Sequence, residues 1–187
     1  MTSDRLSHLS QRMAAITLWL IVAMLLLNAA CWLFPSLSSI RGGYGLGFAL
    51  TDRLISSLNV DVGSFPVWQK LGGIVLSSIP LLALAVGLRH LRRLFQGYGR
   101  REYFSPAAAS HLGSVGRSVG LWVVLSLACE PLLSIWLTMR APAGHRVVTL
   151  SFGSQDIVAL FLAACIAVIA HILRQASELD SENRQFV

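Results

Sequence analysis

The stretch that decides the fold is residues 91–120, LRRLFQGYGRREYFSPAAASHLGSVGRSVG, which lies between two apolar runs. Gly97 and Gly99 predict the end of one helix, because glycine readily takes the left-handed conformation that closes a helix. Ser105 and Pro106 predict the start of the next helix, as its N-cap and its first helical residue. The stretch therefore predicts a helical hairpin. Its turn is basic and carries Arg92, Arg93, Arg100 and Arg101.

The second arm of this hairpin is predicted to be one long helix. It begins at Pro106 and continues through the apolar run to Thr138. At 1.5 Å per residue such a helix is roughly 50 Å long, whereas the hydrocarbon core of a bilayer is about 30 Å thick. The hairpin is therefore expected to extend past the membrane.

The composition excludes an ordinary soluble domain. Of the 187 residues, 55% are hydrophobic and 13% are charged, and the charged share is about half that of soluble proteins. The formal net charge is +6, but the arginines stand at the ends of apolar runs. That pattern is typical of membrane orientation and not of a nucleic-acid surface, so no direct contact with nucleic acid is predicted.

Four apolar runs are long enough to cross the hydrocarbon layer. We therefore predict an all-α, polytopic membrane protein, with residues 1–187 forming a single four-helix transmembrane domain. The predicted spans are residues 13–34, 71–91, 117–139 and 157–173.

The basic residues predict the orientation. Ten of the fifteen lysines and arginines lie in the amino tail, the central stretch and the carboxy tail. Since the side richer in Lys and Arg faces the cytoplasm, both termini are predicted to be cytoplasmic. The expected location is the bacterial cytoplasmic membrane, with the lipid bilayer as the first partner.

Two contacts outside the spans are predicted. Residues 147–152 mix β-branched and aromatic side chains and predict a strand, which we expect to pair with residues 59–62. In the carboxy tail, Glu178, Asp180 and Glu182 leave the membrane on the side of the basic turn. We expect this acidic tail to dock against the arginines of the hairpin.

Gly116 and Gly120 lie on one face of the third span. Small residues at this spacing let two helices approach closely in lipid. The expected partner is the second span of the same chain, and homodimerisation is the alternative.

Glu130 is the only acidic residue well inside a span. An ionisable group at that depth costs about 2.5–3.5 kcal/mol on insertion scales and usually has a partner. One interpretation is a neutral acid that donates to a carbonyl freed by Pro131. The other is a proton or cation site that opens to the outer side. Candidate partners at comparable depth are Asn28, Ser77, Ser78 and Ser134.

Motifs of enzymes are absent from the sequence. There is no zinc-protease, nucleophile-elbow, phosphate-loop or dinucleotide motif, so we expect neither catalysis nor a bound cofactor or metal. His90 and His171 stand near the cytoplasmic ends of their spans. Histidines on facing membrane helices could ligate haem or a metal, and the alternative is a pair of interfacial or hydrogen-bonded side chains.

Two groups of residues carry a resemblance to a known family. They are Leu94-Phe95, Tyr98-Gly99, Tyr103-Phe104-Ser105 and Leu112-Gly113, and the ending Ala176-x-Glu178-Leu179-x-x-Glu182-Asn183-x-x-x-Val187. The chain resembles a bacterial family of four-span membrane proteins that is classed as a domain of unknown function. The resemblance implies a membrane location and a gene often found beside a small helix-turn-helix regulator. It implies no catalytic residues.

The sequence thus favours a regulatory or binding membrane protein with a basic cytoplasmic hairpin. Its expected partners are the bilayer, a cytoplasmic regulator protein and further copies of the chain. The alternatives are an oligomeric transport component that uses Glu130, and a histidine-ligated haem or metal protein.

Overall fold

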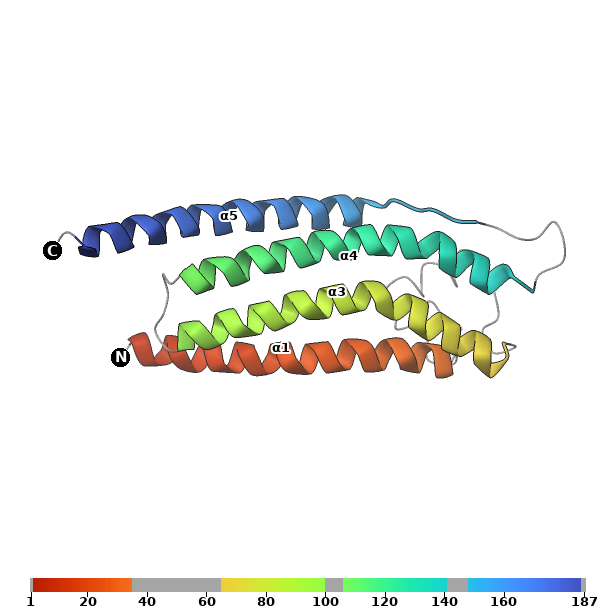
Figure 1. Cartoon of the computed structure of the whole chain (residues 1–187). Coiled ribbons are helices and arrows are strands. Elements are labelled where there is room, and N and C mark those ends of the chain that lie inside the picture. Colours follow the sequence, from red (N-terminus) through yellow and green to blue (C-terminus); the bar gives the residue numbers. More distant parts are fainter. Residues whose placement is uncertain (1, 35–64, 100–105, 141–147, 186–187) are drawn as a thin grey trace. The chain divides into compact units, whose positions relative to one another are not determined.

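A computed structural model of the chain describes residues 2–34, 65–99, 106–140 and 148–185; the side chains of 2–8 and 179–185 are not described. These residues form four long helices and no strand. Figure 1 shows them. They are α1 (Thr2–Leu33), α3 (Val67–Gly99), α4 (Pro106–Thr138) and α5 (Ser154–Gln185).

All four helices contain a segment that is long and apolar enough to cross a membrane. The predicted four-span, all-α class is therefore confirmed. The start of α4 at Pro106 is also confirmed. Each helix continues beyond its predicted span because helix formation depends on backbone hydrogen bonding, which does not stop where the apolar residues stop.

Gly97 and Gly99 are predicted to end the helix, and α3 ends at the second of them. The α3 helix continues through Gly97 to Gly99. A glycine inside a helix costs only about 1 kcal/mol relative to alanine, which the tertiary contacts of a long helix can offset. Residues 100–105, the turn of the predicted hairpin, lie outside the described residues, as do residues 59–62.

The chain divides into two compact units. Unit 1 comprises Met1–Ile21, Ala83–Leu121 and Ser154–Val187, and unit 2 comprises Val22–Leu82 and Trp122–Gly153. The helices α1, α3 and α4 contribute to both units, whereas α5 belongs to unit 1 alone.

In unit 1 the helices approach through small residues. A Cβ atom built on Gly116 would lie 3.0 Å from the carbonyl oxygen of Ala163, and one built on Gly113 would lie 3.5 Å from the Cβ atom of Ala170. The neighbour of Gly116 is therefore α5, and the predicted packing of Gly116 against the second span is wrong. The α3 helix meets α4 at another small residue, Gly87.

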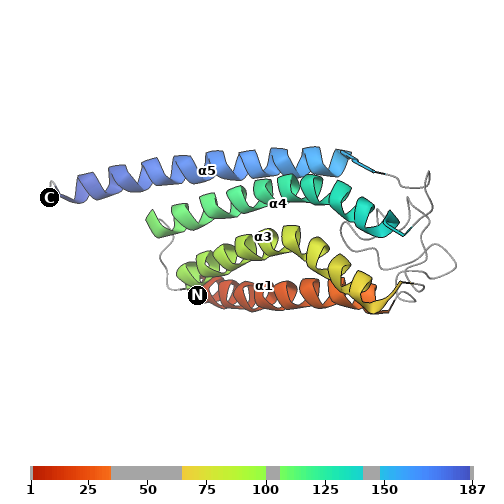
Figure 2. The same cartoon turned by 45° about the vertical axis from the view of Figure 1, so that its right-hand side comes forward.

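The α4 and α5 segments of unit 1 remain side by side when the view is turned (Figures 1 and 2). The order of the contacts shows the relative direction of α4 and α5: Gly113 faces Ala170, and Gly116 faces Ala163. The residue numbers rise along one helix as they fall along the other, so the two helices are antiparallel.

In unit 2 the helices pack around large aromatic side chains. Trp32, Leu133 and Leu137 are fully or almost fully buried, and Ile74 and Leu76 pack against them. The rings of Trp68 and Trp136 meet edge to face, with centroids 5.7 Å apart. This arrangement is favourable for aromatic rings because the positive edge of one meets the negative face of the other.

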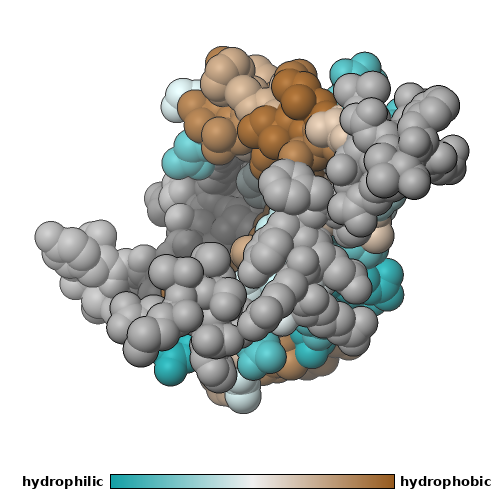
Figure 3. Space-filling model, turned by 90° about the vertical axis from the view of Figure 1, so that its left-hand side faces the viewer, coloured by the Kyte–Doolittle hydropathy of each residue, from teal (hydrophilic) through white to brown (hydrophobic). Residues whose placement is uncertain are grey.

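The outward surfaces of the helices are apolar. Trp19 is 72% exposed and Phe161 is 67% exposed. In Figure 3 hydrophobic residues form a continuous brown area at the top of the view, at the height of α5 in Figure 1. Water would make such a surface unfavourable, whereas lipid tails are as apolar as the side chains. The exposed pattern therefore agrees with a bilayer environment.

Candidate functional site

The buried carboxylate of Glu130 binds the chain segment that follows α4. Glu130 is 3% exposed. Its Oε2 atom accepts a hydrogen bond from the backbone N–H of Ser151 at 3.1 Å, and its Oε1 atom accepts one from the Ser151 hydroxyl. One turn further along α4, the Ser134 hydroxyl oxygen accepts from the backbone N–H of Thr149 at 3.2 Å. We call residues 148–153 the strap.

The spacing of these bonds explains why a strap fits here. Glu130 and Ser134 are four residues apart on a helix, a rise of about 6 Å. Thr149 and Ser151 are two residues apart in an extended chain, a rise of about 6.6 Å. The two distances match, so two donors on one side of the strap meet two acceptors on one face of α4.

The strap also explains why the predicted strand is absent from residues 148–152. The backbone N–H groups of Thr149 and Ser151 bond to side chains of α4. They therefore do not need a neighbouring strand. The alternate side chains, Val148, Leu150 and Phe152, are exposed, as expected for an extended segment with one face against a helix.

Sequence reasoning missed the partner of Glu130. The predicted bond to a carbonyl freed by Pro131 is wrong, because Ser151 provides two donors and makes Glu130 an acceptor. Ser134, another candidate partner of Glu130, donates its hydroxyl to the Pro131 carbonyl at 2.8 Å. A serine in the connection between α4 and α5 gave no signal, since nothing local predicts that this connection folds back onto α4.

The other predicted polar residues form a separate cluster in unit 2. The Asn28 side-chain amide donates to Ser77 at 3.0 Å and to Ser78 at 3.1 Å. The indole N–H of Trp32, which the sequence analysis did not include, donates to the same Ser77 oxygen at 3.1 Å. Asn28, Ser77 and Ser78 are thus brought together as predicted, but their bonds join α1 to α3 and do not reach Glu130.

The beginning of α3 and the end of α4 are joined by a reciprocal exchange. The Gln69 side-chain amide donates to the Trp136 carbonyl at 3.1 Å and to the Leu137 carbonyl at 3.4 Å. In return the Trp136 indole donates to the Gln69 carbonyl at 3.0 Å. Gln69 therefore bonds to carbonyls in the last turn of α4, which have no partner within that helix.

In unit 1, His90 of α3 pairs with a histidine that was not predicted. Its Nδ1 atom lies 3.2 Å from Nδ1 of His111 on α4. His171 is exposed on α5. A haem between His90 and His111 has no room at this separation, because the macrocycle would have to lie between the rings. The part of the chain that the structure describes contains no group of three potential metal ligands.

The structure describes two of the four predicted hairpin arginines. Arg93 is exposed and Arg92 is half-buried; the Nε atom of Arg92 is buried and has no hydrogen-bond partner among the described residues. Arg100 and Arg101 lie outside the described residues. In the tail, Glu178 pairs with Arg174 of its own helix at 3.1 Å, and the predicted contacts of Asp180 and Glu182 are not described.

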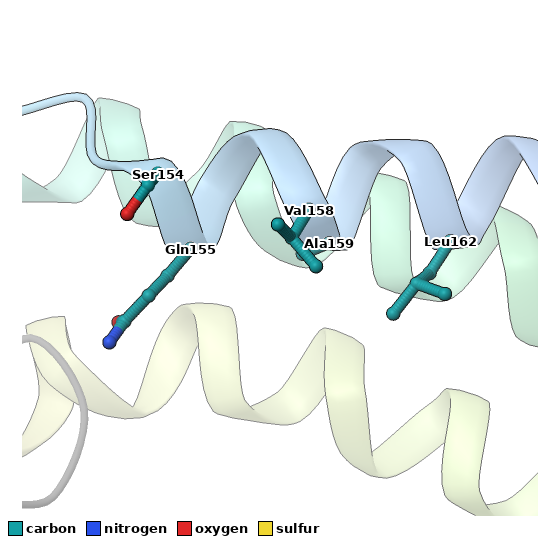
Figure 4. A pocket seen from close by; sticks show the side chains of 5 residues that line it. All are labelled: Ser154, Gln155, Val158, Ala159 and Leu162. Atoms are coloured by element: carbon teal, nitrogen blue, oxygen red, sulfur yellow. The ribbon is translucent and has the colours of Figure 1, made fainter.

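A shallow cavity of about 370 Å³ lies against the first turns of α5. Figure 4 shows its lining, Ser154, Gln155, Val158, Ala159 and Leu162, along that helix. The lining contains no ionisable side chain. Its chemistry suits an apolar chain with a polar end and not a charged substrate.

The comparison with protein families agrees with this architecture. The family described as "Protein of unknown function (DUF2975)" matches residues 13–186. The chain belongs to the DUF2975 family. The match includes α1 from Met13 onward and the whole of α3, α4 and α5, so the strap and the histidine pair both lie within the DUF2975 region. No curated protein and no solved structure matches the chain.

Proposed function

We propose that this DUF2975 protein is a regulatory or binding protein of the bacterial cytoplasmic membrane and not an enzyme. In this proposal both termini face the cytoplasm, and the α3–α4 hairpin binds a soluble cytoplasmic protein. The bilayer itself is the environment of the four apolar helices.

The observation that carries the proposal is the continuation of both hairpin arms beyond their apolar runs. The α3 helix continues from Arg89 to Gly99, and α4 begins at Pro106, before Arg117. Each extension is roughly 15 Å long. A helical projection of this length goes beyond the lipid headgroups, which add about 5–8 Å on each side of the hydrocarbon core.

The two arms are held together at the base of this projection. His90 contacts His111, and a Cβ atom on Gly87 would lie 2.8 Å from the Cβ atom of Ser118. Contacts of this kind support a preformed surface. Preformed surfaces bind partners with less loss of conformational entropy than flexible ones.

The charge of the projection indicates the chemistry of the partner. Among the described residues, no acidic side chain forms an ion pair with Arg89, Arg92 or Arg93. With Arg100 and Arg101 in the turn, the projection suits a protein with an acidic surface. A small soluble regulator, as the family resemblance implies, is the partner we propose.

Transport through an oligomer is less well supported. A transport pathway needs polar groups that can exchange partners with a substrate. Both carboxylate oxygens of Glu130 bond to Ser151, and Asn28 bonds to Ser77 and Ser78. These polar groups are engaged in contacts within the protein, and a transported substrate would have to displace those contacts.

Site-specific crosslinking in native membranes tests the proposal. A photoreactive residue replaces Gln96, which is exposed on α3, and a second variant carries it at the exposed Val124 of α4. We expect a soluble protein to crosslink at position 96 and only lipid at position 124. Reversing the turn charges with Arg100→Glu and Arg101→Glu should remove that product, whereas Arg12→Glu should not. Crosslinks only to further copies of the chain would overturn the proposal.

A further inference from the structure

The base of the α3–α4 hairpin carries two histidines and two arginines. The imidazoles of His90 and His111 are 3.2 Å apart, and Arg93 stands three residues after His90, on the same face of α3. Arg117 also donates to the Ser114 hydroxyl at 3.2 Å, so its guanidinium is directed back toward the hairpin. We call His90, Arg93, His111 and Arg117 the His–Arg cluster.

No described acidic side chain neutralises this cluster. The one ion pair among the described residues is Arg174 with Glu178 on α5. Arg93 and Arg117 are exposed, and guanidinium groups provide planar pairs of N–H donors that match phosphate and carboxylate geometry. A neutral imidazole adds one N–H donor. Within the part of the chain that the structure describes, the cluster therefore offers donors and positive charge without an acceptor of opposite charge.

The position of the cluster in the sequence indicates which anion it binds. His90 stands at the end of the apolar run of α3, and Arg117 stands at the beginning of the apolar run of α4. Both boundaries are where lipid phosphates lie, just outside the hydrocarbon core. Basic side chains at this level attract anionic lipids by about 1 kcal/mol for each Lys or Arg.

We propose that the His–Arg cluster is a binding site for the phosphate of an anionic phospholipid headgroup. Arg93 and Arg117 pair with the phosphate oxygens, and an N–H of the histidine pair donates a hydrogen bond to them from the base of the hairpin. This site shares Arg93 with the partner-binding projection, but Arg117 belongs to the cluster alone, and Arg100 and Arg101 belong to the partner surface alone. Substitutions of Arg117 and of Arg100 with Arg101 therefore test the two proposals separately.

The test compares bilayers of two compositions. The whole chain is reconstituted in nanodiscs of phosphatidylcholine, or of phosphatidylcholine with phosphatidylglycerol, and native mass spectrometry counts the lipids that stay bound after gentle release. We expect the chain to retain phosphatidylglycerol in preference. Removing both charges with Arg93→Gln and Arg117→Gln should weaken this binding roughly thirtyfold, at about fivefold for each arginine.

Matched controls separate a site from general attraction. Arg12→Gln and Arg174→Gln remove exposed boundary arginines of α1 and α5, and they should change retention by less than twofold. An equal loss of phosphatidylglycerol retention in these controls would contradict the proposed site. Unchanged retention in the cluster variants would overturn it as well, and the single variants give the same readout if the double variant is unstable.

A second arm distinguishes the source of the phosphate. Inorganic phosphate is added to the chain in phosphatidylcholine discs, and thermal unfolding is followed. We expect no stabilisation at concentrations at which phosphatidylglycerol stabilises the chain. If inorganic phosphate alone stabilises it equally, and the stabilisation disappears in the cluster variants, the ligand is free phosphate and the lipid assignment is wrong.

Discussion

Unit 1 and unit 2 hold their helices together by different means. In unit 1, α4 and α5 meet through Gly113, Gly116 and alanines, so the backbones themselves approach. In unit 2, the rings of Trp32 and Trp136 lie over glycines of α3 and donate hydrogen bonds across the helix pairs. Membrane helices have no hydrophobic force between them, so close packing and polar bonds drive their association. Unit 1 relies mainly on close packing, and unit 2 adds polar bonds. The difference teaches that substitutions should act differently in the two units.

The largest effect is expected at Gly73 in unit 2. A Cβ atom there would overlap the ring of Trp32, which is fully buried and bonded to Ser77. Since the ring cannot move aside, Gly73→Ala should destabilise the protein by about 3 kcal/mol, the upper part of the range for overpacking. Unfolding in mixed micelles measures the change. Gly120→Ala is the matched control, because no atom lies within 4 Å of a Cβ there, and an equal loss at both would refute the packing argument.

The next effect concerns the strap. Glu130→Ala removes both acceptors of Ser151 and should cost about 2 kcal/mol, because each of the two buried hydrogen bonds contributes about 1 kcal/mol. Glu130→Gln keeps one side-chain oxygen and should lose about half as much. Labelling of a cysteine at position 149 reports release of the strap directly. If the strap is labelled no faster in Glu130→Ala than in the original chain, Glu130 does not hold it.

A smaller loss is expected at Gly116 in unit 1. A Cβ atom there would lie 3.0 Å from the Ala163 carbonyl and 3.3 Å from the Ala167 nitrogen, which is tight without overlap. Gly116→Ala should therefore cost about 1 kcal/mol, because α5 must shift by a few tenths of an ångström. Unfolding in the same micelles measures this change. A loss larger than that of Gly73→Ala would reverse the comparison between the units.

The smallest effect is the coupling between Asn28 and Ser77. Interhelical hydrogen bonds in membranes average about 0.6 kcal/mol, because the separated helices also find polar partners. A double-mutant cycle of Asn28→Ala and Ser77→Ala should return a coupling of this size. A coupling near zero would show that the Trp32 bond to Ser77 replaces the Asn28 bond when Asn28 is removed.

The helices themselves could be predicted because their signals are local. Apolar length defines the spans, and Ser105-Pro106 marks the start of α4. The histidine pair was missed: His90 lies nine residues before the end of α3, and His111 lies five residues after the start of α4, so counting outward from the turn does not pair them directly. The His90–His171 hypothesis instead compared depths alone.

Other contacts could not be predicted because they depend on which faces meet. The strap bonds to α4 only if the connection folds back on the helix before it, and Ser151 carries no local sign of that. Gly116 packs against α5 and not against the second span because of how the helices of unit 1 are arranged. The spacing of residues in the sequence does not predict that arrangement. Polar residues at one depth were correctly grouped for Asn28 and Ser77, and wrongly for Glu130.

The exchange between Gln69 and Trp136 has a practical consequence for the connection that follows α4. The carbonyls of Trp136 and Leu137 in the last turn of α4 are satisfied from α3, so the end of the helix does not rely on a terminating sequence downstream. Residues 141–147 should therefore accept a short inserted epitope without loss of the helix. An antibody added to intact cells and to inverted vesicles would then determine which side of the membrane carries the connection.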